Sequence, residues 1–329
     1  MKMKRKIYFR ADASASIGYG HFIRTLALAD MLKDDFDCTF FTCHPTPYQV
    51  DEMEKVCPFL ALREETHYDD FLSHLQDDEI VVLDNYFFDT GYQRAIKGKG
   101  CRLVCIDDMH DKHYVADVVI NHGLTDESLF DVEPYTKLCL GLDWALLRKE
   151  FYQPLLRKRR EEGLWLVSFG GSDFYNLTFK YVDFLQQLPS VRQITVIVGD
   201  SYKYKEMLDS MDKVTLTERL SAQEIQDLFS VVSVAILPSS TIAIEALACG
   251  CPVVSGYYID NQRGIYGTLL SRNLIVGIGD MLSIDRVLIS EKKMEDIKSL
   301  RSCVFDSRIK EKFIYLFNVL SYENTDIGR

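Results

Sequence analysis

A chain of 329 residues exceeds the usual size of a single hydrophobic core, so we expect two domains. Its net charge of −11 disfavours nucleic acids and acidic membrane surfaces as partners, because both repel an acidic protein. No apolar run approaches the length of a membrane span, and the basic start lacks the apolar core of a signal peptide. The nine cysteines include no C-x-x-C pair and fit buried free thiols. We therefore expect a cytoplasmic globular protein.

Strand-like and helix-like segments alternate along the first half of the chain, which is typical of a parallel sheet covered by helices. Strands are predicted at 6–10, 37–43, 59–62, 79–84, 101–106, 118–121 and 137–141, and helices at 20–33, 46–56, 68–77 and 89–98. A charged stretch at 156–163 then interrupts the pattern, where a domain boundary is expected. Further strands are predicted at 164–169, 193–198, 213–216, 233–237, 252–257 and 273–276, before a last helix at 307–321.

This repeated alternation predicts an α/β protein with two Rossmann-like domains, 1–155 and 156–329, that face each other across a cleft. In open parallel sheets, ligands bind at the carboxyl ends of the strands. Functional residues are therefore expected in the loops that follow the strands.

The stretch between the first strand and the first helix contains Gly18, Gly20 and His21. Two glycines let a turn approach a ligand closely, and a helix start offers free N–H groups. A dinucleotide fingerprint would need a third glycine where Ile23 stands, and an acidic residue at the end of the next strand is missing. The turn therefore predicts a site for an anionic or sugar ligand, with His21 at its mouth.

Several motifs, in order, cover most of residues 6–265. They are R-x-D-x-S-x-x-I-G-x-G-H-x-x-R-x-L at 10–26, the segments 83–86, 106–108, 141–151 and 169–173, and S-T-x-x-x-E-A-L-A-x-G-x-P at 240–252. Together they resemble the UDP-sugar hydrolase family of the pseudaminic-acid pathway, which is related to the glycosyltransferase that makes lipid II.

The resemblance implies a glycosyltransferase-B type fold, with a last helix that packs back across the domain junction. It implies hydrolysis of UDP-2,4-diacetamido-2,4,6-trideoxy-β-L-altrose by water attack at the anomeric carbon, with inversion and release of UDP. The free sugar would pass to a synthase that makes a nonulosonic acid. No cofactor is expected, and we expect a monomer.

His21 is the candidate catalytic residue. The positive partial charge at a helix start disfavours an imidazolium, so a neutral base remains available to take a proton from water. The alternative is a histidine that only caps or packs. Asp12 would either orient His21 or bind a sugar hydroxyl, and a loop aspartate in an Asx-turn is the alternative.

Other substrate contacts are expected from Gly18, Tyr19 and Gly20 in the turn and from Tyr86, which resembles a substrate-contacting tyrosine of the family. Tyr86 follows another strand of the first domain and lies at the same edge of the predicted sheet. Its neighbour Asp84 is interpreted as a possible cap for the helix that begins near residue 89.

In the second domain, Ser239, Ser240 and Thr241 precede an apolar helix, and three hydroxyls with free N–H groups favour a diphosphate. Ordinary capping needs only one of them. Relatives usually carry Gly-Gly before the hydroxyl residue, whereas this chain has Pro238 and Ser239.

Glu245 is the sole charge in that apolar helix, and a buried carboxylate needs hydrogen bonds. In the wider glycosyltransferase-like superfamily the matching glutamate binds the ribose hydroxyls, and a structural ion pair is the alternative. The remaining substrate contacts are expected from Gly171, Asp173, Asn261 and Gln262.

The segment 107–113 contains three aspartates and two histidines, yet its spacing matches no standard zinc site, so no metal is expected. Two other functions remain open. A glycosyltransferase of the same fold would transfer the sugar to an acceptor other than water, and a non-catalytic protein would bind the UDP-sugar without turnover.

Overall fold

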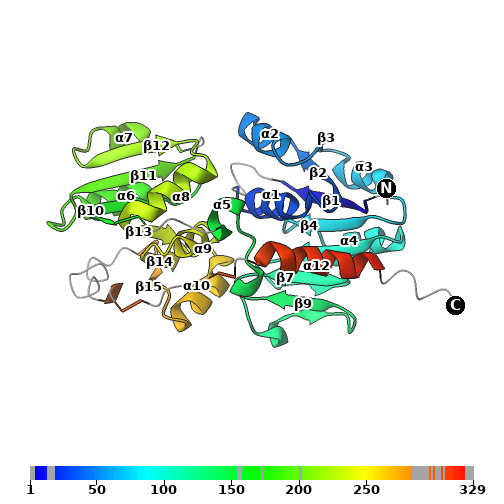
Figure 1. Cartoon of the computed structure of the whole chain (residues 1–329). Coiled ribbons are helices and arrows are strands. Elements are labelled where there is room, and N and C mark those ends of the chain that lie inside the picture. Colours follow the sequence, from blue (N-terminus) through cyan, green and yellow to red (C-terminus); the bar gives the residue numbers. More distant parts are fainter. Residues whose placement is uncertain are drawn as a thin grey trace. The chain divides into compact units, whose positions relative to one another are not determined.

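The computed structural model describes residues 4–12, 19–153, 158–171, 173–199, 202–283 and 308–322, with short stretches at 296–297, 299–300 and 305–306. These residues form two compact units, Met1–Lys149 with Asp306–Arg329, and Glu150–Phe305 (Figure 1). The division falls between Lys149 and Glu150, slightly before the expected boundary after residue 155.

The first unit contains a seven-stranded sheet of order β3-β2-β1-β4-β5-β7-β9, in which every pair is parallel. Its strands are β1 (Lys6–Ala11), β2 (Asp37–Cys43), β3 (Phe59–Leu62), β4 (Ile80–Asp84), β5 (Arg102–Ile106), β7 (Val118–Asn121) and β9 (Lys137–Leu140). The short strands β6 (His113–Tyr114) and β8 (Asp131–Val132) pair separately. The helices are α1 (Gly20–Leu32), α2 (Pro47–Glu54), α3 (His67–His74), α4 (Thr90–Gly98), η1 (Glu127–Leu129) and η2 (Leu142–Trp144). The short helix α5 (Lys149–Tyr152) spans the division between the units.

The second unit contains a six-stranded parallel sheet of order β12-β11-β10-β13-β14-β15. Its strands are β10 (Glu161–Val167), β11 (Gln193–Val198), β12 (Val214–Glu218), β13 (Val232–Pro238), β14 (Val253–Tyr257) and β15 (Val276–Asp280). Its helices are α6 (Leu177–Leu185), α7 (Lys205–Asp209), α8 (Ala222–Val231), α9 (Thr241–Ala248) and α10 (Gln262–Ser271). The predicted α/β class with two Rossmann-like sheets is confirmed, because both strand orders are those of doubly wound sheets.

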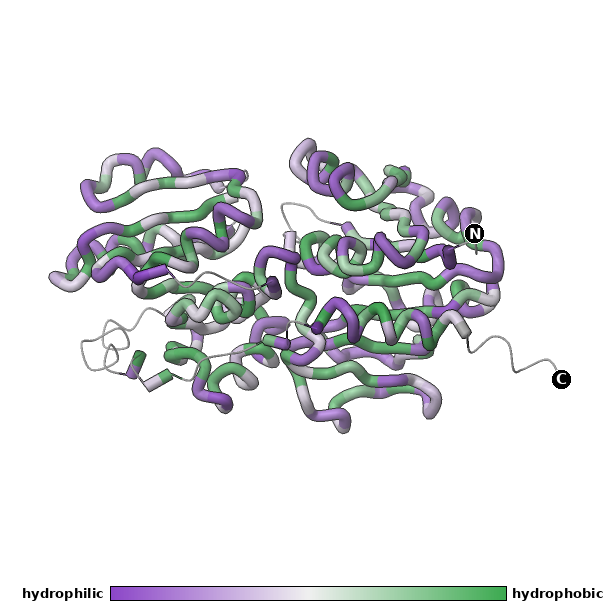
Figure 2. The backbone as a smooth tube through the Cα atoms, in the orientation of Figure 1, coloured by the Kyte–Doolittle hydropathy of each residue, from purple (hydrophilic) through white to green (hydrophobic). Residues whose placement is uncertain are grey.

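The cores explain why these sequences form sheets. Strands that are buried on both faces read as nearly continuous apolar runs, and Figure 2 shows the strands of each sheet largely in green. The segment 80–84 is fully buried, as are the side chains of the core around Trp165 in the second unit.

The last helix, α12 (Ile309–Tyr322), packs on the first unit (Figure 1). Phe313 contacts Trp144 with ring centroids 5.4 Å apart, and Phe317 contacts Phe36 at 6.2 Å. The helix lies against α1, so the final segment of the chain belongs with the unit that carries His21.

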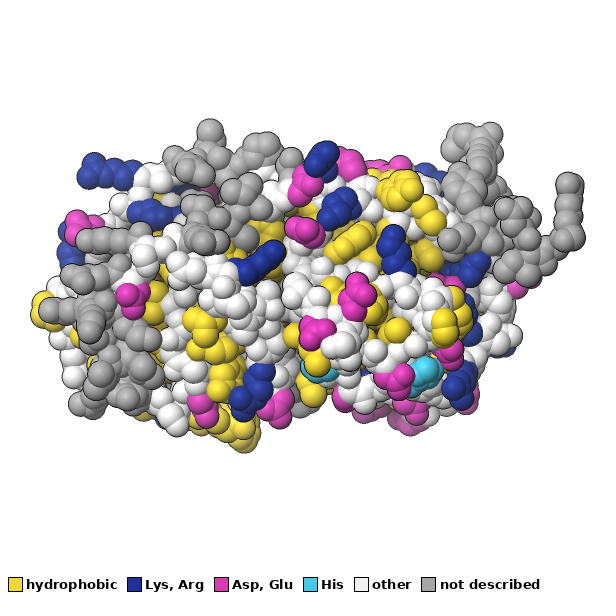
Figure 3. Space-filling model, turned by 90° about the horizontal axis from the view of Figure 1, so that it is seen from below, with side chains coloured by type: hydrophobic (Ala, Val, Ile, Leu, Met, Phe, Trp, Pro, Cys, Tyr) yellow, Lys and Arg dark blue, Asp and Glu magenta, His cyan; other side chains and the backbone are white. Residues whose placement is uncertain are grey.

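The surface is mixed in character. On the face seen in Figure 3, acidic, basic and hydrophobic side chains alternate among the described residues, without a large basic area. Among the described helices, none is both long and apolar enough to cross a membrane.

Candidate active site

The first unit has a topological switch point between β1 and β4. The chain leaves β1 toward β2 on one side, and leaves β4 toward β5 on the other, so the loops diverge at the carboxyl ends. Ala11 pairs with Asp84 in the sheet register, and Asp12 therefore follows beside Asn85. The backbone N–H of Asp12 donates to the Asn85 Oδ1 at 2.7 Å.

His21 lies at this point, on the first turn of α1, and is 4% exposed. Its Nδ1 is 2.6 Å from Oδ1 of Asp84. Arg24 and Thr25 follow one turn later on the same helix face, and both also donate to Asp84. A carboxylate at the end of β4 therefore receives three side chains from one face of α1.

The charges in this group set the tautomer of His21. Burial alone would raise the pKa of Asp84, but Arg24 and His21 outweigh it and lower this pKa to about 2. An ionised carboxylate can only accept, so Nδ1 of His21 carries the proton. Arg24 Nη2 also lies 3.1 Å from this Nδ1. Because both nitrogens carry protons, neither accepts from the other, and both donate to the Asp84 carboxylate. The other ring nitrogen, Nε2, keeps its lone pair and is the basic atom.

The interpretation of Asp84 as a helix cap is wrong. The cap of α4 is Asp89, whose Oδ1 accepts from the backbone N–H of Tyr92 at 2.7 Å. Because Asp84 and His21 lie 63 positions apart, no local signal in the sequence pairs them.

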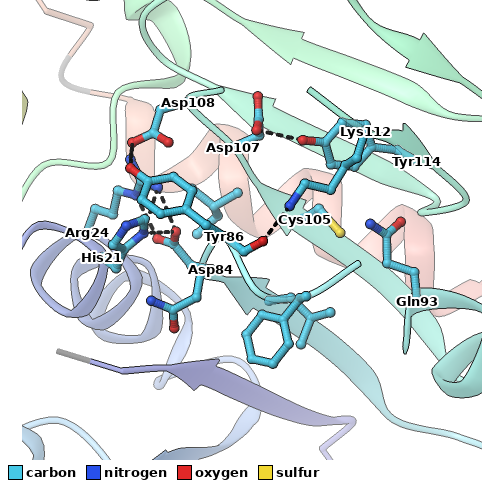
Figure 4. Close-up of a pocket in the computed structure, with 14 residues that line it drawn as sticks. His21, Arg24, Asp84, Tyr86, Gln93, Cys105, Asp107, Asp108, Lys112 and Tyr114 are labelled. Atoms are coloured by element: carbon cyan, nitrogen blue, oxygen red, sulfur yellow. Dashed lines mark hydrogen bonds and ion pairs between the residues drawn. The ribbon is translucent and has the colours of Figure 1, made fainter. Parts of the chain in front are cut away.

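A small pocket adjoins His21, with a cavity volume of about 20 Å³ (Figure 4). Tyr86 lies at its mouth, 42% exposed, with its ring edge-on to His21 at a centroid distance of 4.6 Å. The Tyr86 hydroxyl donates to Oδ2 of Asp108 at 3.2 Å, and Lys112 Nζ donates to the Tyr86 carbonyl at 2.9 Å. The remaining walls come from the ends of β4 and β5 and from Gln93 and Tyr114.

Asp12 does not orient His21, which was the first of the two roles expected for it, because Asp84 contacts His21. Arg10 forms a two-point ion pair with Asp12, and Asp12 Oδ1 also accepts from the Thr42 hydroxyl at 3.1 Å and the Cys43 N–H at 2.7 Å. Asp12 is only 9% exposed, so its carboxylate joins the ends of β1 and β2.

The structure describes the glycine turn only in part, because Gly18 lies outside the described residues. Gly20 is the first residue of α1, and a Cβ added there would meet no atom within 4 Å. Tyr19 is the N-cap of α1 and contributes no side-chain cap, while its ring contacts Tyr48 at 5.5 Å.

The acidic segment after β5 has a structural explanation. The Asp107 carboxylate accepts from the N–H groups of Met109 and His110, the Tyr114 hydroxyl and the Asn121 amide. Within the described parts of the chain, no group of three or more His, Cys, Asp or Glu side chains is arranged to hold a metal ion.

In the second unit the matching switch point lies between β10 and β13. Ser239 is fully buried there, its hydroxyl is 2.7 Å from that of Ser255, and its N–H donates to the Gly256 carbonyl at 2.8 Å. Its hydroxyl thus joins β13 to β14, and the expected cradle of three hydroxyls is reduced to Ser240 and Thr241. Ser240 is the N-cap of α9 and makes no side-chain cap hydrogen bond.

Two further residues predicted to bind substrate make hydrogen bonds within the second unit. Asp173 accepts from the N–H groups of Leu177 and Thr178 at 2.8 and 2.7 Å, so it satisfies two N–H groups at the start of α6. The Gln262 side-chain oxygen accepts from the Tyr258 N–H at 3.0 Å. Burial below 5% for both residues agrees with these roles.

The other predicted residues of this unit are placed as follows. Glu245 is 2% exposed and lies one turn after Thr241 on α9. Asn261 is the N-cap of α10. Gly171 lies so close to Gly199 that a side chain on Gly199 would collide with its backbone.

The UDP-2,4-diacetamido-2,4,6-trideoxy-β-L-altropyranose hydrolase of Campylobacter jejuni is 26% identical over 78% of this chain and 93% of its own length. The expected resemblance is confirmed. An uncharacterised protein of Methanocaldococcus jannaschii is 27% identical over 81% of this chain, which spans 58% of that protein. The family model described as "Glycosyl transferases group 1" matches residues 174–272.

Solved structures agree on the fold. MurG of Acinetobacter baumannii matches 96% of this chain and 99% of its own with a TM-score of 0.57 and 12% identity. HepE of Anabaena, solved with UDP and glucose, matches 95% of this chain and 99% of its own with a TM-score of 0.62 and 12% identity. The chain therefore has the glycosyltransferase-B type architecture, with two Rossmann-like domains.

Proposed function

We propose that this protein hydrolyses a UDP-linked diacetamido-trideoxy-hexose to UDP and the free sugar, as a step toward a nonulosonic acid such as pseudaminic acid. The observation that carries the proposal is the His21–Asp84 contact of 2.6 Å beside the Tyr86 pocket. A histidine held in this tautomer offers Nε2 as a base to a water molecule. The name of the Campylobacter jejuni relative supports the substrate class.

In the proposed reaction, Nε2 of His21 takes a proton from water as the water oxygen attacks the anomeric carbon. The bond from this carbon to the diphosphate oxygen breaks, its electron pair leaves with UDP, and the single displacement inverts the anomeric centre. Asp84 stabilises the imidazolium that forms, because its carboxylate stays ionised. Tyr86 provides an aromatic surface for the sugar.

The nucleotide is assigned to residues of the second unit. The N–H groups at the start of α9 suit a phosphate, since the first turn of a helix leaves them without intrahelical partners. Ser240 and Thr241 add hydroxyl groups there, and Glu245 would accept from the ribose hydroxyls. Asn261, at the start of α10, is a further candidate contact.

A glycosyltransferase of the same fold is the second candidate, because the matched family model describes glycosyl transferases. It would use the same base to deprotonate a hydroxyl of an acceptor instead of water. A protein that binds the UDP-sugar without turnover is the third.

The deciding experiment incubates the protein with a panel of UDP-sugars, including the substrate named for the Campylobacter jejuni relative, and measures UDP release and the anomeric configuration of the sugar. Release of UDP and an inverted free sugar without any acceptor supports hydrolysis. Release that depends on an added acceptor indicates a transferase, and binding without release indicates a sensor.

The His21→Ala variant tests the assignment of the base. Loss of a general base typically lowers the rate by about 10²–10⁴, while UDP affinity should stay within a few fold. A variant with near-full turnover would remove His21 from the mechanism.

A further inference from the structure

Arg24 contacts two carboxylates that belong to different parts of the pocket (Figure 4). Its Nε and Nη2 donate to the two oxygens of Asp84, both at 2.6 Å. Its Nη1 donates to Oδ2 of Asp108 at 2.8 Å, and the Tyr86 hydroxyl donates to this same oxygen. A continuous set of contacts therefore runs from His21 through Asp84, Arg24 and Asp108 to Tyr86.

This arrangement is buried and permanently charged. Arg24 is 4% exposed, and although burial alone would favour its neutral form, Asp108 and Asp84 raise its pKa well above the ordinary value. Hydrogen bonds between charged partners in a buried site are stronger and more directional than neutral ones. A shift of the guanidinium would therefore disturb both carboxylates together.

The charges of the group are unequal. The carboxylates of Asp84 and Asp108 share the single guanidinium of Arg24. The nearby His122 is neutral, because burial and the charge of Arg24 lower its pKa to about 4.

We propose that Arg24 is a positioning residue that couples the base to the sugar-contacting tyrosine, with Asp84 fixing His21 and Asp108 fixing Tyr86. Neither Arg24 nor Asp108 touches the reacting atoms in this scheme. The kinetic part of this inference rests on the proposed function, whereas the hydrogen-bond part can be tested without turnover.

The first test is spectroscopic and uses the full chain. A proton shared between Nδ1 of His21 and the ionised Asp84 at 2.6 Å gives a far-downfield proton NMR signal. His21→Ala and Asp84→Asn assign the signal by abolishing it. Arg24→Lys keeps the charge but loses the planar guanidinium group that donates to both carboxylates. This variant and Asp108→Asn should both shift or broaden the signal.

Two matched controls accompany these variants. Arg102→Lys alters an arginine that pairs with Asp117 at the start of β7, away from the carboxyl ends of the strands. Asp111→Asn removes an exposed carboxylate three positions after Asp108. Both should leave the signal unchanged. A downfield signal in Asp108→Asn and Arg24→Lys identical to that of the unmodified protein would overturn the coupling, whether or not the protein turns over any UDP-sugar.

The second test is kinetic. Asp108→Asn should raise KM more than it lowers kcat, because the contact that holds the Tyr86 hydroxyl is lost while Asp84 still contacts His21. Asp111→Asn should leave both constants unchanged.

A double-mutant cycle then isolates the coupling to the sugar contact. Tyr86→Phe keeps the ring and removes the hydroxyl, so it should raise KM more than it lowers kcat. The double variant Tyr86→Phe with Asp108→Asn should have a kcat/KM less than threefold lower than that of Asp108→Asn alone, because both changes break the same contact. If the loss of kcat/KM in the double variant equals the product of the losses in the two single variants, Asp108 is not the residue that holds Tyr86. Absence of turnover in the unmodified protein would refute the proposed function but not the NMR result.

Discussion

In the first unit, the strand order around β1 and β4 brings a histidine, an arginine and two carboxylates together beside one pocket. The same order recurs around β10 and β13 in the second unit, yet there Ser239, Asp173 and Gln262 are engaged in holding strands and helix starts. The difference shows that a shared topology supplies a place for a ligand, while the side chains that reach it decide what can happen there. In the proposed reaction the first unit supplies side-chain chemistry, and the second supplies mainly backbone N–H groups and Glu245.

The sharpest test of this contrast is Asp84→Asn. An asparagine can offer an N–H where the carboxylate accepted, which favours the wrong tautomer of His21, and the expected loss of kcat is about 10³–10⁴. UDP affinity should be unaffected, because the nucleotide contacts are assigned to the second unit.

The matched control is Asp117→Asn, which alters a buried carboxylate bound to Lys97 and Arg102 at the start of β7. Thermal melts of both variants separate activity from stability, since removing one partner of a buried ion pair costs about 3–5 kcal/mol. An Asp84→Asn protein with kcat within tenfold of the unmodified protein would contradict the role of the first unit.

Glu245→Ala examines the second unit. If the carboxylate binds two ribose hydroxyls, charge-assisted hydrogen bonds worth about 1.5–3 kcal/mol each disappear from the complex. UDP affinity should then fall by one to several decades with little change in melting temperature, as measured by calorimetric titration and a thermal melt. A large drop in melting temperature with intact UDP affinity would make Glu245 structural.

The pH dependence of stability probes the buried side of the first unit. The folded pKa of His122 is about 4, against an ordinary value of 6.5, so the unfolded chain binds more protons between these values. The free energy of unfolding should therefore fall as pH decreases from about 6.5 to 4, by about 3 kcal/mol from this residue.

His122→Gln should flatten that decline, because glutamine does not titrate and can still accept from the Leu146 N–H. His113→Gln serves as the control with the opposite sign, since hydrogen bonds that His113 donates to Asp131 and Glu133 raise the pKa of His113 and favour folding at low pH. Chemical denaturation at a series of pH values measures both, and an unchanged slope in His122→Gln would show that this histidine titrates normally.

Ser239→Ala distinguishes a structural serine from a phosphate ligand. Losing the contact with Ser255 should cost about 1 kcal/mol of stability and leave UDP affinity unchanged. Thr241→Ala is the comparison, and there we expect weaker UDP binding. If Ser239→Ala weakens UDP binding more than Thr241→Ala, the assignment of the two residues must be reversed.

The smallest expected effect is that of a chelator. Because N–H groups at the start of α9 are proposed to bind the diphosphate, EDTA should change the rate of UDP release by less than twofold. Activity that is lost with EDTA and restored by magnesium or manganese would disprove this proposal.

The amino-acid sequence alone determined the α/β class, because apolar runs of strand length alternate with helical periodicity in both halves. It also predicted His21 at a helix start from the turn before it, and Tyr86 from a separate motif that follows another strand. The Glu245 helix was recognised in the same way, from one charge in an apolar segment. Local patterns suffice for such features, since they depend on neighbours within a few residues.

Only the tertiary structure decided which polar side chains are partners. Asp84 and Asp12 each follow a strand and look alike in the sequence, yet the register between β1 and β4 directs Asp84 to α1, while Arg10 and Thr42 engage Asp12. Likewise, pairing of β13 with β14 turns Ser239 toward Ser255, although it is adjacent to Ser240 in the chain. Strand register and the face that each residue occupies depend on the packing of the whole sheet, so contacts between residues tens of positions apart do not follow from local periodicity.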